Sequence, residues 1–103
     1  MLFVTSESEI KLEDSFQGLY FYASWMPYHK KMLIMIDKME DKFKNIKFMA
    51  IDIDSFKNQV IRFNINSIPT IIILNNGKEV KRINGLVLTS AFKRAVADIC
   101  NGS

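Results

Sequence analysis

Residues 19–30, Leu-Tyr-Phe-Tyr-Ala-Ser-Trp-Met-Pro-Tyr-His-Lys, join an apolar run to an amphipathic segment. The first five are all apolar or aromatic, which predicts a central strand that is covered on both faces. From residue 28 to about residue 44, apolar residues recur every three to four positions, which predicts a helix. Pro27 suits the first turn of that helix, where a missing N–H has no cost. Residues 25–30 are therefore expected where a strand gives way to a helix.

The rest of the chain predicts further strands and helices around this junction. Strands are expected at residues 2–5, 46–53, 70–74 and 79–83, the last two forming a hairpin because Asn76-Gly77 favours a tight turn. Ser6 and Glu9 have the spacing of a capping box, which predicts a helix over residues 6–16. A short helix is expected after residues 54–55 and a last one over residues 89–100, ended by Gly102. The order βαβαβαββα predicts an α/β domain with a mixed sheet between helix layers.

Composition limits the class of protein. The 103 residues suit one domain, residues 1–103, and 49% hydrophobic with 24% charged residues is typical of an ordered globular chain. The apolar runs are too short to span a bilayer, and residues 1–5 lack the basic start of a secretory signal, so we expect a cytoplasmic protein that does not contact a membrane. The net charge of +3 comes from interspersed lysines, which does not predict nucleic-acid binding.

Four local features resemble the thioredoxin family in order and spacing. They are residues 21–25 (Phe-Tyr-Ala-Ser-Trp), residues 51–54 (Ile-Asp-Ile-Asp), Ile68-Pro69-Thr70, and Asn76-Gly77 together with Gly85. The resemblance covers about residues 2–99. It implies a thioredoxin-like three-layer α/β/α sandwich with a mixed central sheet of about five strands.

The motif that carries the chemistry of this family is altered in this chain. The family's Cys-x-x-Cys is replaced by Met26-Pro27-Tyr28-His29, so the motif positions 26 and 29 carry no thiol. A dithiol mechanism needs a thiolate that attacks sulfur and a second thiol that resolves the mixed disulfide, so it is excluded at these positions. The resemblance also places the family's buried acid at Tyr20 and its partner lysine at Ala50.

The resemblance implies a binding face for a protein partner or an extended peptide. In the family the proline of Ile-Pro-Thr is cis, and the backbone before it pairs with the peptide, a role that carries over to Pro69 and Ile68. Alone, Pro69 also fits the first residue of an edge strand. Aromatic and thioether side chains suit an interface, although they are also compatible with packing that involves no partner. The predicted partner-binding residues are Trp25, Met26, Pro27, Tyr28, His29, Ile68 and Pro69.

Other candidate chemistry is weaker. The single cysteine, Cys100, lies in the last predicted helix and is expected to be a small buried hydrophobe. His29 is expected at the surface of a first helical turn, since no nucleophile or orienting acid adjoins it in sequence to support a general base. Met26 and His29 are too few ligands for copper. We therefore predict no metal site, no catalytic residue and no cofactor.

Three functions follow as hypotheses. The leading one is a redox-inactive thioredoxin-like domain that acts as a protein-interaction or adaptor module, and so is not an enzyme. The second is a thioredoxin- or glutaredoxin-related oxidoreductase, or a glutathione-binding protein, of unorthodox mechanism; the pair Pro27-Tyr28 matches the centre of the glutaredoxin motif. The third is a structural subunit of a larger assembly.

Overall fold

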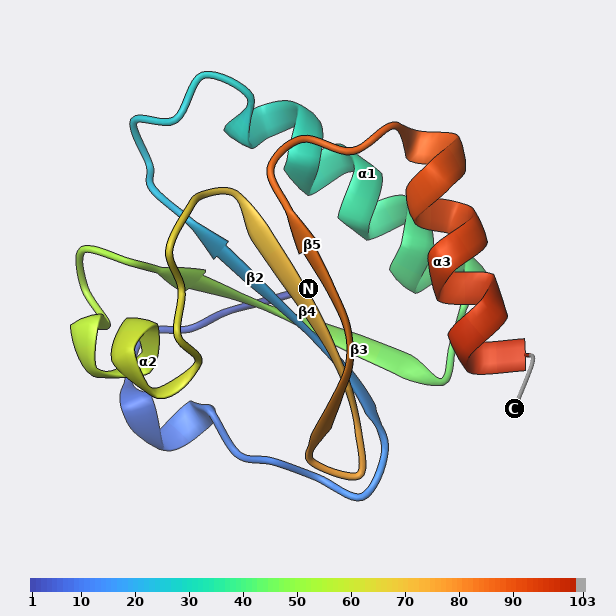
Figure 1. Cartoon of the computed structure of the whole chain (residues 1–103), viewed down its shortest axis with the longest axis horizontal. Coiled ribbons are helices and arrows are strands. Elements are labelled where there is room, and N and C mark those ends of the chain that lie inside the picture. Colours follow the sequence, from blue (N-terminus) through green and yellow to red (C-terminus); the bar gives the residue numbers. More distant parts are fainter. Residues whose placement is uncertain (102–103) are drawn as a thin grey trace.

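A five-stranded sheet lies between two layers of helices in the computed structural model, which describes residues 1–101 (Figure 1). The strand order is β1-β3-β2-β4-β5. The strands β1, β2 and β3 are parallel to one another, β4 is antiparallel to β2, and β5 is antiparallel to β4. The strands are β1 (Leu2–Phe3), β2 (Phe16–Tyr22), β3 (Ile46–Asp52), β4 (Thr70–Asn75) and β5 (Lys78–Asn84). The predicted sandwich with a mixed sheet of five strands is confirmed.

Two helices cover one face of the sheet and a short helix covers the other (Figure 1). The helices α1 (His29–Lys42) and α3 (Thr89–Asn101) lie side by side, and α2 (Lys57–Arg62) lies on the opposite face. These bounds agree with the predicted helices within a few residues, while the predicted stop at Gly102 lies outside the described residues. Over residues 1–101, none of the helices combines the length and the hydropathy that crossing a membrane requires.

The predicted helix over residues 6–16 is wrong. Only one 3₁₀ turn forms, η1 (Glu7–Glu9), where the Glu9 carboxylate accepts hydrogen bonds from the Thr5 and Ser6 N–H groups at 2.6 and 3.0 Å. Beyond this turn, the buried side chain of Gln17 accepts from the Glu13 N–H (3.0 Å) and donates to the Lys11 carbonyl (2.8 Å). These bonds satisfy backbone groups of a non-helical segment, which then leads into β2.

The central strand β2 is buried on both faces, as its sequence predicts. Leu19, Tyr20 and Phe21 are all fully buried. One core cluster packs under α1 and α3 and includes Tyr20, whereas the second lies on the α2 side and includes Leu19 and Phe21. Because β2 is held from both sides, it fixes the position of the segment that leaves its carboxyl end.

The hairpin that joins β4 and β5 also follows its sequence signal. Asn76 and Gly77 have φ values of 53° and 78°. Two successive residues with positive φ form the type I′ turn whose twist matches two antiparallel strands. The hairpin places the chain after β5 beside the start of α1 (Figure 1).

Candidate functional site

The altered motif lies in the turn that joins β2 to α1. The Met26 N–H donates to the Ala23 carbonyl (3.0 Å), and the His29 N–H donates to the Met26 carbonyl (3.3 Å). The Met32 N–H then donates to the Tyr28 carbonyl (3.0 Å), which begins the hydrogen-bond pattern of α1. The motif therefore lies at the carboxyl end of the central strand, where the sequence places it.

His29 is held in one orientation by two tyrosines of β2. Its Nδ1 lies 2.9 Å from the hydroxyl oxygen of Tyr20, within hydrogen-bond distance, and the donor depends on the imidazole tautomer. Its ring stacks on Tyr22, with centroids 4.3 Å apart and planes 9° apart. Tyr20 and Tyr22 are themselves stacked at 5.3 Å. The hydrogen bond and the stack together restrict the rotation of the imidazole.

The surroundings of this cluster favour neutral side chains. Burial lowers the pKa of His29, and the nearby carboxylate of Asp52 opposes this change. Burial likewise raises the pKa of Tyr20, and it raises the pKa of Tyr22 with a smaller contribution from Asp52. Near neutral pH the imidazole is therefore mainly neutral, and both tyrosines keep their protons. With Nδ1 engaged by Tyr20, Nε2 is the ring atom that remains to exchange a proton with a ligand.

The lowered pKa of His29 predicts a pH dependence of stability. Below its ordinary pKa of about 6.5, the unfolded chain binds a proton at His29 before the folded chain does, so the free energy of unfolding falls as the pH falls from about 7 to 5. Above about pH 7 this contribution is constant. We expect His29→Gln to lose less stability than the wild type over this interval in urea unfolding at each pH. If the free energy of unfolding fell equally in the wild type and in His29→Gln, His29 would not be the source of the pH dependence.

The segment before β4 lies against the loop that follows β5. The Ile68–Pro69 peptide bond is cis, and the Pro69 carbonyl accepts a hydrogen bond from the Gly85 N–H at 2.7 Å. The Thr70 hydroxyl donates to the Ser67 carbonyl, also at 2.7 Å. Pro69 is buried and Ile68 is half-buried. This connection holds residues 67–70 and residue 85 together.

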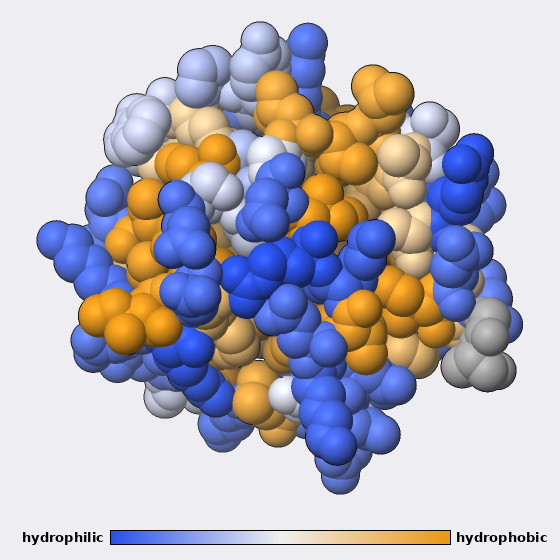
Figure 2. All heavy atoms as spheres, in the orientation of Figure 1, coloured by the Kyte–Doolittle hydropathy of each residue, from blue (hydrophilic) through white to orange (hydrophobic). Residues whose placement is uncertain are grey.

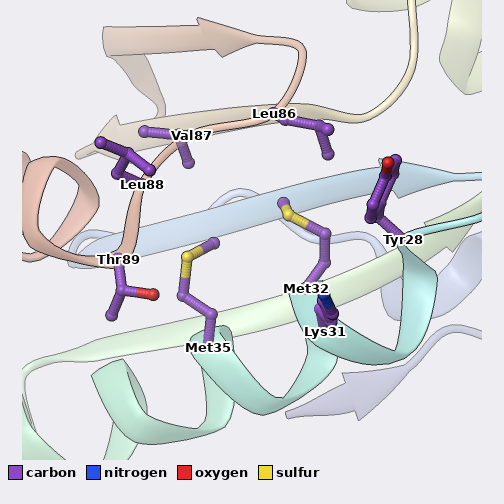
Figure 3. A pocket seen from close by; sticks show the side chains of 8 residues that line it. All are labelled: Tyr28, Lys31, Met32, Met35, Leu86, Val87, Leu88 and Thr89. Atoms are coloured by element: carbon purple, nitrogen blue, oxygen red, sulfur yellow. The ribbon is translucent and has the colours of Figure 1, made fainter.

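The residues of the predicted binding face are distributed over two grooves and the core. Trp25, which is 69% exposed, and Ile68 line one groove of about 300 Å³ together with side chains from the α2 region. Tyr28 lines a second groove of about 330 Å³ between α1 and residues 86–89 (Figure 3). Pro27 is exposed, whereas Met26 is only 8% exposed and belongs to the core cluster under α1. His29 lies half-buried against β2.

Sequence reasoning missed Tyr22 and Asp52, and it treated Tyr20 only as the position of a lost acid. The sequence contains a signal for the tyrosine pair, because Tyr20 and Tyr22 are two residues apart on one strand and therefore project to the same face of the sheet. Asp52 is the register partner of Tyr22 in the parallel pair β2–β3. Their approach to His29 depends on how the start of α1 sits over β2.

Cys100 does not belong to this site, because it lies at the far end of the chain in α3. Cys100 lies near the carboxyl end of α3 and is 9% exposed, and burial raises the pKa of its thiol. A thiol in such surroundings is a poor nucleophile. Within residues 1–101, no three or more His, Cys, Asp or Glu residues are grouped so that they could hold a metal ion.

Comparisons with known proteins agree with this geometry. The thioredoxin family model matches residues 5–98. Thioredoxin H2 of Arabidopsis thaliana is 32% identical over 78 residues, which cover 76% of this chain and 59% of that protein. Thioredoxin-1 of Saccharomyces cerevisiae is 28% identical over 85 residues, which cover 82% of each protein. The solution structure of oxidised thioredoxin from Plasmodium falciparum superimposes with a TM-score of 0.88 over 97% of this chain and 98% of that one, at 24% identity.

These comparisons correct the leading functional hypothesis. The relatives carry the name thioredoxin, the solved structure is described as an oxidised thioredoxin, and none of these names describes a redox-inactive adaptor. The hypothesis of a redox-inactive interaction module is therefore wrong. It rested on the absence of thiols at Met26 and His29, which excludes one mechanism but does not identify a function. The comparisons favour the second hypothesis, a thioredoxin-related oxidoreductase of unorthodox mechanism.

Proposed function

This chain belongs to the thioredoxin family, and on that premise we propose that it catalyses thiol–disulfide exchange by a route that uses no thiol of its own motif. The thiol is supplied by glutathione and the disulfide by an extended peptide. The observation that carries the proposal is the fixed imidazole of His29, whose Nδ1 lies 2.9 Å from the Tyr20 hydroxyl and whose ring stacks on Tyr22. It occupies the position of the family's second cysteine.

The reaction balances without a further reductant. The step uses the tautomer in which Nδ1 of His29 carries the ring hydrogen and donates it to the Tyr20 oxygen, so that Nε2 has a free lone pair. Nε2 accepts the proton of the glutathione thiol, and the resulting thiolate attacks one sulfur of the peptide disulfide. A new S–S bond forms between glutathione and that sulfur as the original S–S bond breaks. The leaving thiolate then takes the proton from His29. The glutathione sulfur is oxidised to a disulfide, and the leaving sulfur is reduced to a thiol.

Binding of the peptide is assigned to the face around Pro69. The groove lined by Trp25 and Ile68 offers apolar walls for alternate side chains of an extended chain, and the backbone of Ile68 offers hydrogen-bonding groups. Both Trp25 and Tyr28 are exposed enough to contact a bound peptide. The reaction suits a compartment that holds glutathione as a thiol, so the expected location is the cytoplasm.

Replacing His29 tests the proposal through its pH dependence. Near pH 7 only about 3% of a thiol with a pKa of about 8.5 is ionised, so a perfect base accelerates the reaction by about thirtyfold at most. We expect His29→Gln to lower kcat/KM for glutathione-dependent reduction of a disulfide peptide by about tenfold at that pH. The difference should vanish near pH 9.5, where the thiol ionises unaided.

Two control variants make this result specific. Lys30→Gln changes an exposed neighbour at the same helix start and should leave the rate unchanged. Cys100→Ser removes the only thiol of the chain and should also leave it unchanged. Loss of turnover in Cys100→Ser, or a tenfold loss in His29→Gln that persists near pH 9.5, would refute the thiol-free route.

A further inference from the structure

A second groove adjoins the motif at Tyr28 and shares no lining residue with the groove that Trp25 lines. Met32 and Met35 form its floor and point from α1 toward residues 86–88, which form the facing wall (Figure 3). Tyr28 and Thr89 lie at its two ends (Figure 3). The two methionines are 4% and 5% exposed. Since methionine side chains adapt to different shapes, such a floor can accept more than one apolar side chain.

The wall of this groove exposes large apolar side chains to solvent. Leu86 is 56% exposed and Leu88 is 77% exposed, and Tyr28 is 47% exposed at the near end. Figure 2 shows hydrophobic side chains gathered where the chain passes from β5 to α3. A single exposed leucine is ordinary, but an apolar cluster beside a groove is typical of a binding surface.

The rim of the groove is positively charged. Of the described residues that line it, only Lys31 carries a charge, and its ammonium lies 5.9 Å from the centroid of the Tyr28 ring. Two helices begin at the groove, α1 at His29 and α3 at Thr89, and in the part of the chain that the structure describes neither has an acidic residue in its first turn. The amino ends of helices attract negative charge. The complementary ligand is therefore apolar with an adjacent anionic group.

We propose that this groove binds the part of a disulfide peptide substrate in which a large apolar residue adjoins an acidic residue. The inference rests on the proposed function and specifies its substrate class. Tyr28 belongs to both the motif and the groove, so a peptide that reacts near His29 can extend into the groove without leaving the surface. The apolar side chain lies over Met32 and Met35, and the carboxylate faces Lys31.

Synthetic peptides that differ at two positions test the groove. Fluorescent probes have serine in place of cysteine, so that binding is measured without reaction, and carry Leu-Glu, Leu-Lys or Ser-Glu at the variable pair. Fluorescence anisotropy should show Leu-Glu bound about fivefold more tightly than either other probe. Lys31→Glu should reverse the order of Leu-Glu and Leu-Lys, and Leu88→Asp should weaken the Leu-Glu probe about tenfold. Both positions are exposed, so neither variant disturbs the core.

Two matched control variants make the same kinds of substitution, lysine to glutamate and a large apolar residue to aspartate, outside the groove. Lys38→Glu alters another exposed lysine of α1, and Ile61→Asp alters a residue of α2 that is 77% exposed. Both should bind the three probes as the wild type does. Equal affinity of the wild type for Leu-Glu and Leu-Lys would overturn the proposal. Tighter binding of decanoate than of every peptide would also overturn it, because the occupant would then be a fatty anion. A wild-type dimer that Leu88→Asp dissociates would overturn it as well, because the occupant would then be a second copy of the chain.

Turnover of bis(2-hydroxyethyl) disulfide with glutathione separates this proposal from the proposed function. This small disulfide does not reach the groove, so its turnover by the wild type and by Lys38→Glu, which lies outside the groove, reports the exchange reaction alone. If the protein turns over this disulfide but binds the three peptide probes equally, the groove proposal is wrong and the exchange reaction stands. If it distinguishes the peptide probes but does not turn over this disulfide, the exchange reaction is wrong and the groove remains a peptide site.

Discussion

Gly18→Ala is expected to lower the free energy of unfolding by about 2–3 kcal/mol. Gly18 lies in the central strand β2, and a Cβ built on it falls 2.1 Å from Cδ1 and 2.2 Å from Cε1 of Phe48. The Phe48 ring is 1% exposed and meets Phe92 edge to face at 6.0 Å, so it has little room to move. Elsewhere, replacing glycine by alanine at a compatible backbone position stabilises a protein by about 0.4–1 kcal/mol. A loss of stability in Gly18→Ala, in place of this gain, would therefore indicate the steric clash with Phe48.

A double-mutant cycle identifies the cause of this loss. In a Phe48→Leu background the side chain opposite residue 18 is smaller, so adding Gly18→Ala should cost about 1 kcal/mol less than it does in the wild type. Denaturant unfolding followed by circular dichroism measures each corner of the cycle. Lys47→Ala, at the neighbouring exposed position of β3, serves as the surface control. Equal losses in the two backgrounds would show that Phe48 is not responsible.

Local sequence signals predicted most of the fold because they coincide with the tertiary structure. The apolar run of β2 is buried on both faces, and Asn76-Gly77 forms the predicted tight hairpin. The helix over residues 6–16 failed for the opposite reason. Its capping signal is real, since Glu9 accepts hydrogen bonds from the Thr5 and Ser6 N–H groups. However, no apolar face follows it, and the buried side chain of Gln17 satisfies the backbone N–H of Glu13 and the carbonyl of Lys11 in a non-helical conformation.

The candidate site was less predictable because it depends on contacts between elements. The sequence places His29 at the start of a helix, but not on Tyr22 or within 2.9 Å of the Tyr20 hydroxyl. The imidazole was expected at the surface, and instead it has two orienting tyrosines and a carboxylate, Asp52, that acts on its pKa. The groove beside Tyr28 includes residues 86–88, which follow no helical or strand period and so give no sequence signal.

Met26→Cys combined with His29→Cys is expected to raise insulin reduction by dithiothreitol about a hundredfold above the wild-type rate. The His29 N–H donates to the Met26 carbonyl at 3.3 Å, so positions 26 and 29 close a four-residue turn. The Cα atoms that end such a turn lie less than about 7 Å apart, close to the range that a disulfide spans. Both thiols would lie at the amino end of α1, position 26 in the turn that leads into the helix and position 29 at its first residue. A helix amino end lowers the pKa of a thiol, which increases the fraction of the reactive thiolate.

Met26→Ser combined with His29→Ser is the matched control, because it changes volume and polarity similarly without supplying thiols. It should reduce insulin no faster than the wild type. The serine variant also lacks His29 and gains no thiol, so it should lose the glutathione-dependent acceleration near pH 7. A gain of insulin reduction in the cysteine variant and none in the serine variant would show that the two thiols, and not the smaller side chains, restore the dithiol reaction. If the oxidised variant contains the 26–29 disulfide but does not reduce insulin, the face around Pro69 does not present a peptide disulfide to position 26, and the proposed peptide site is then wrong.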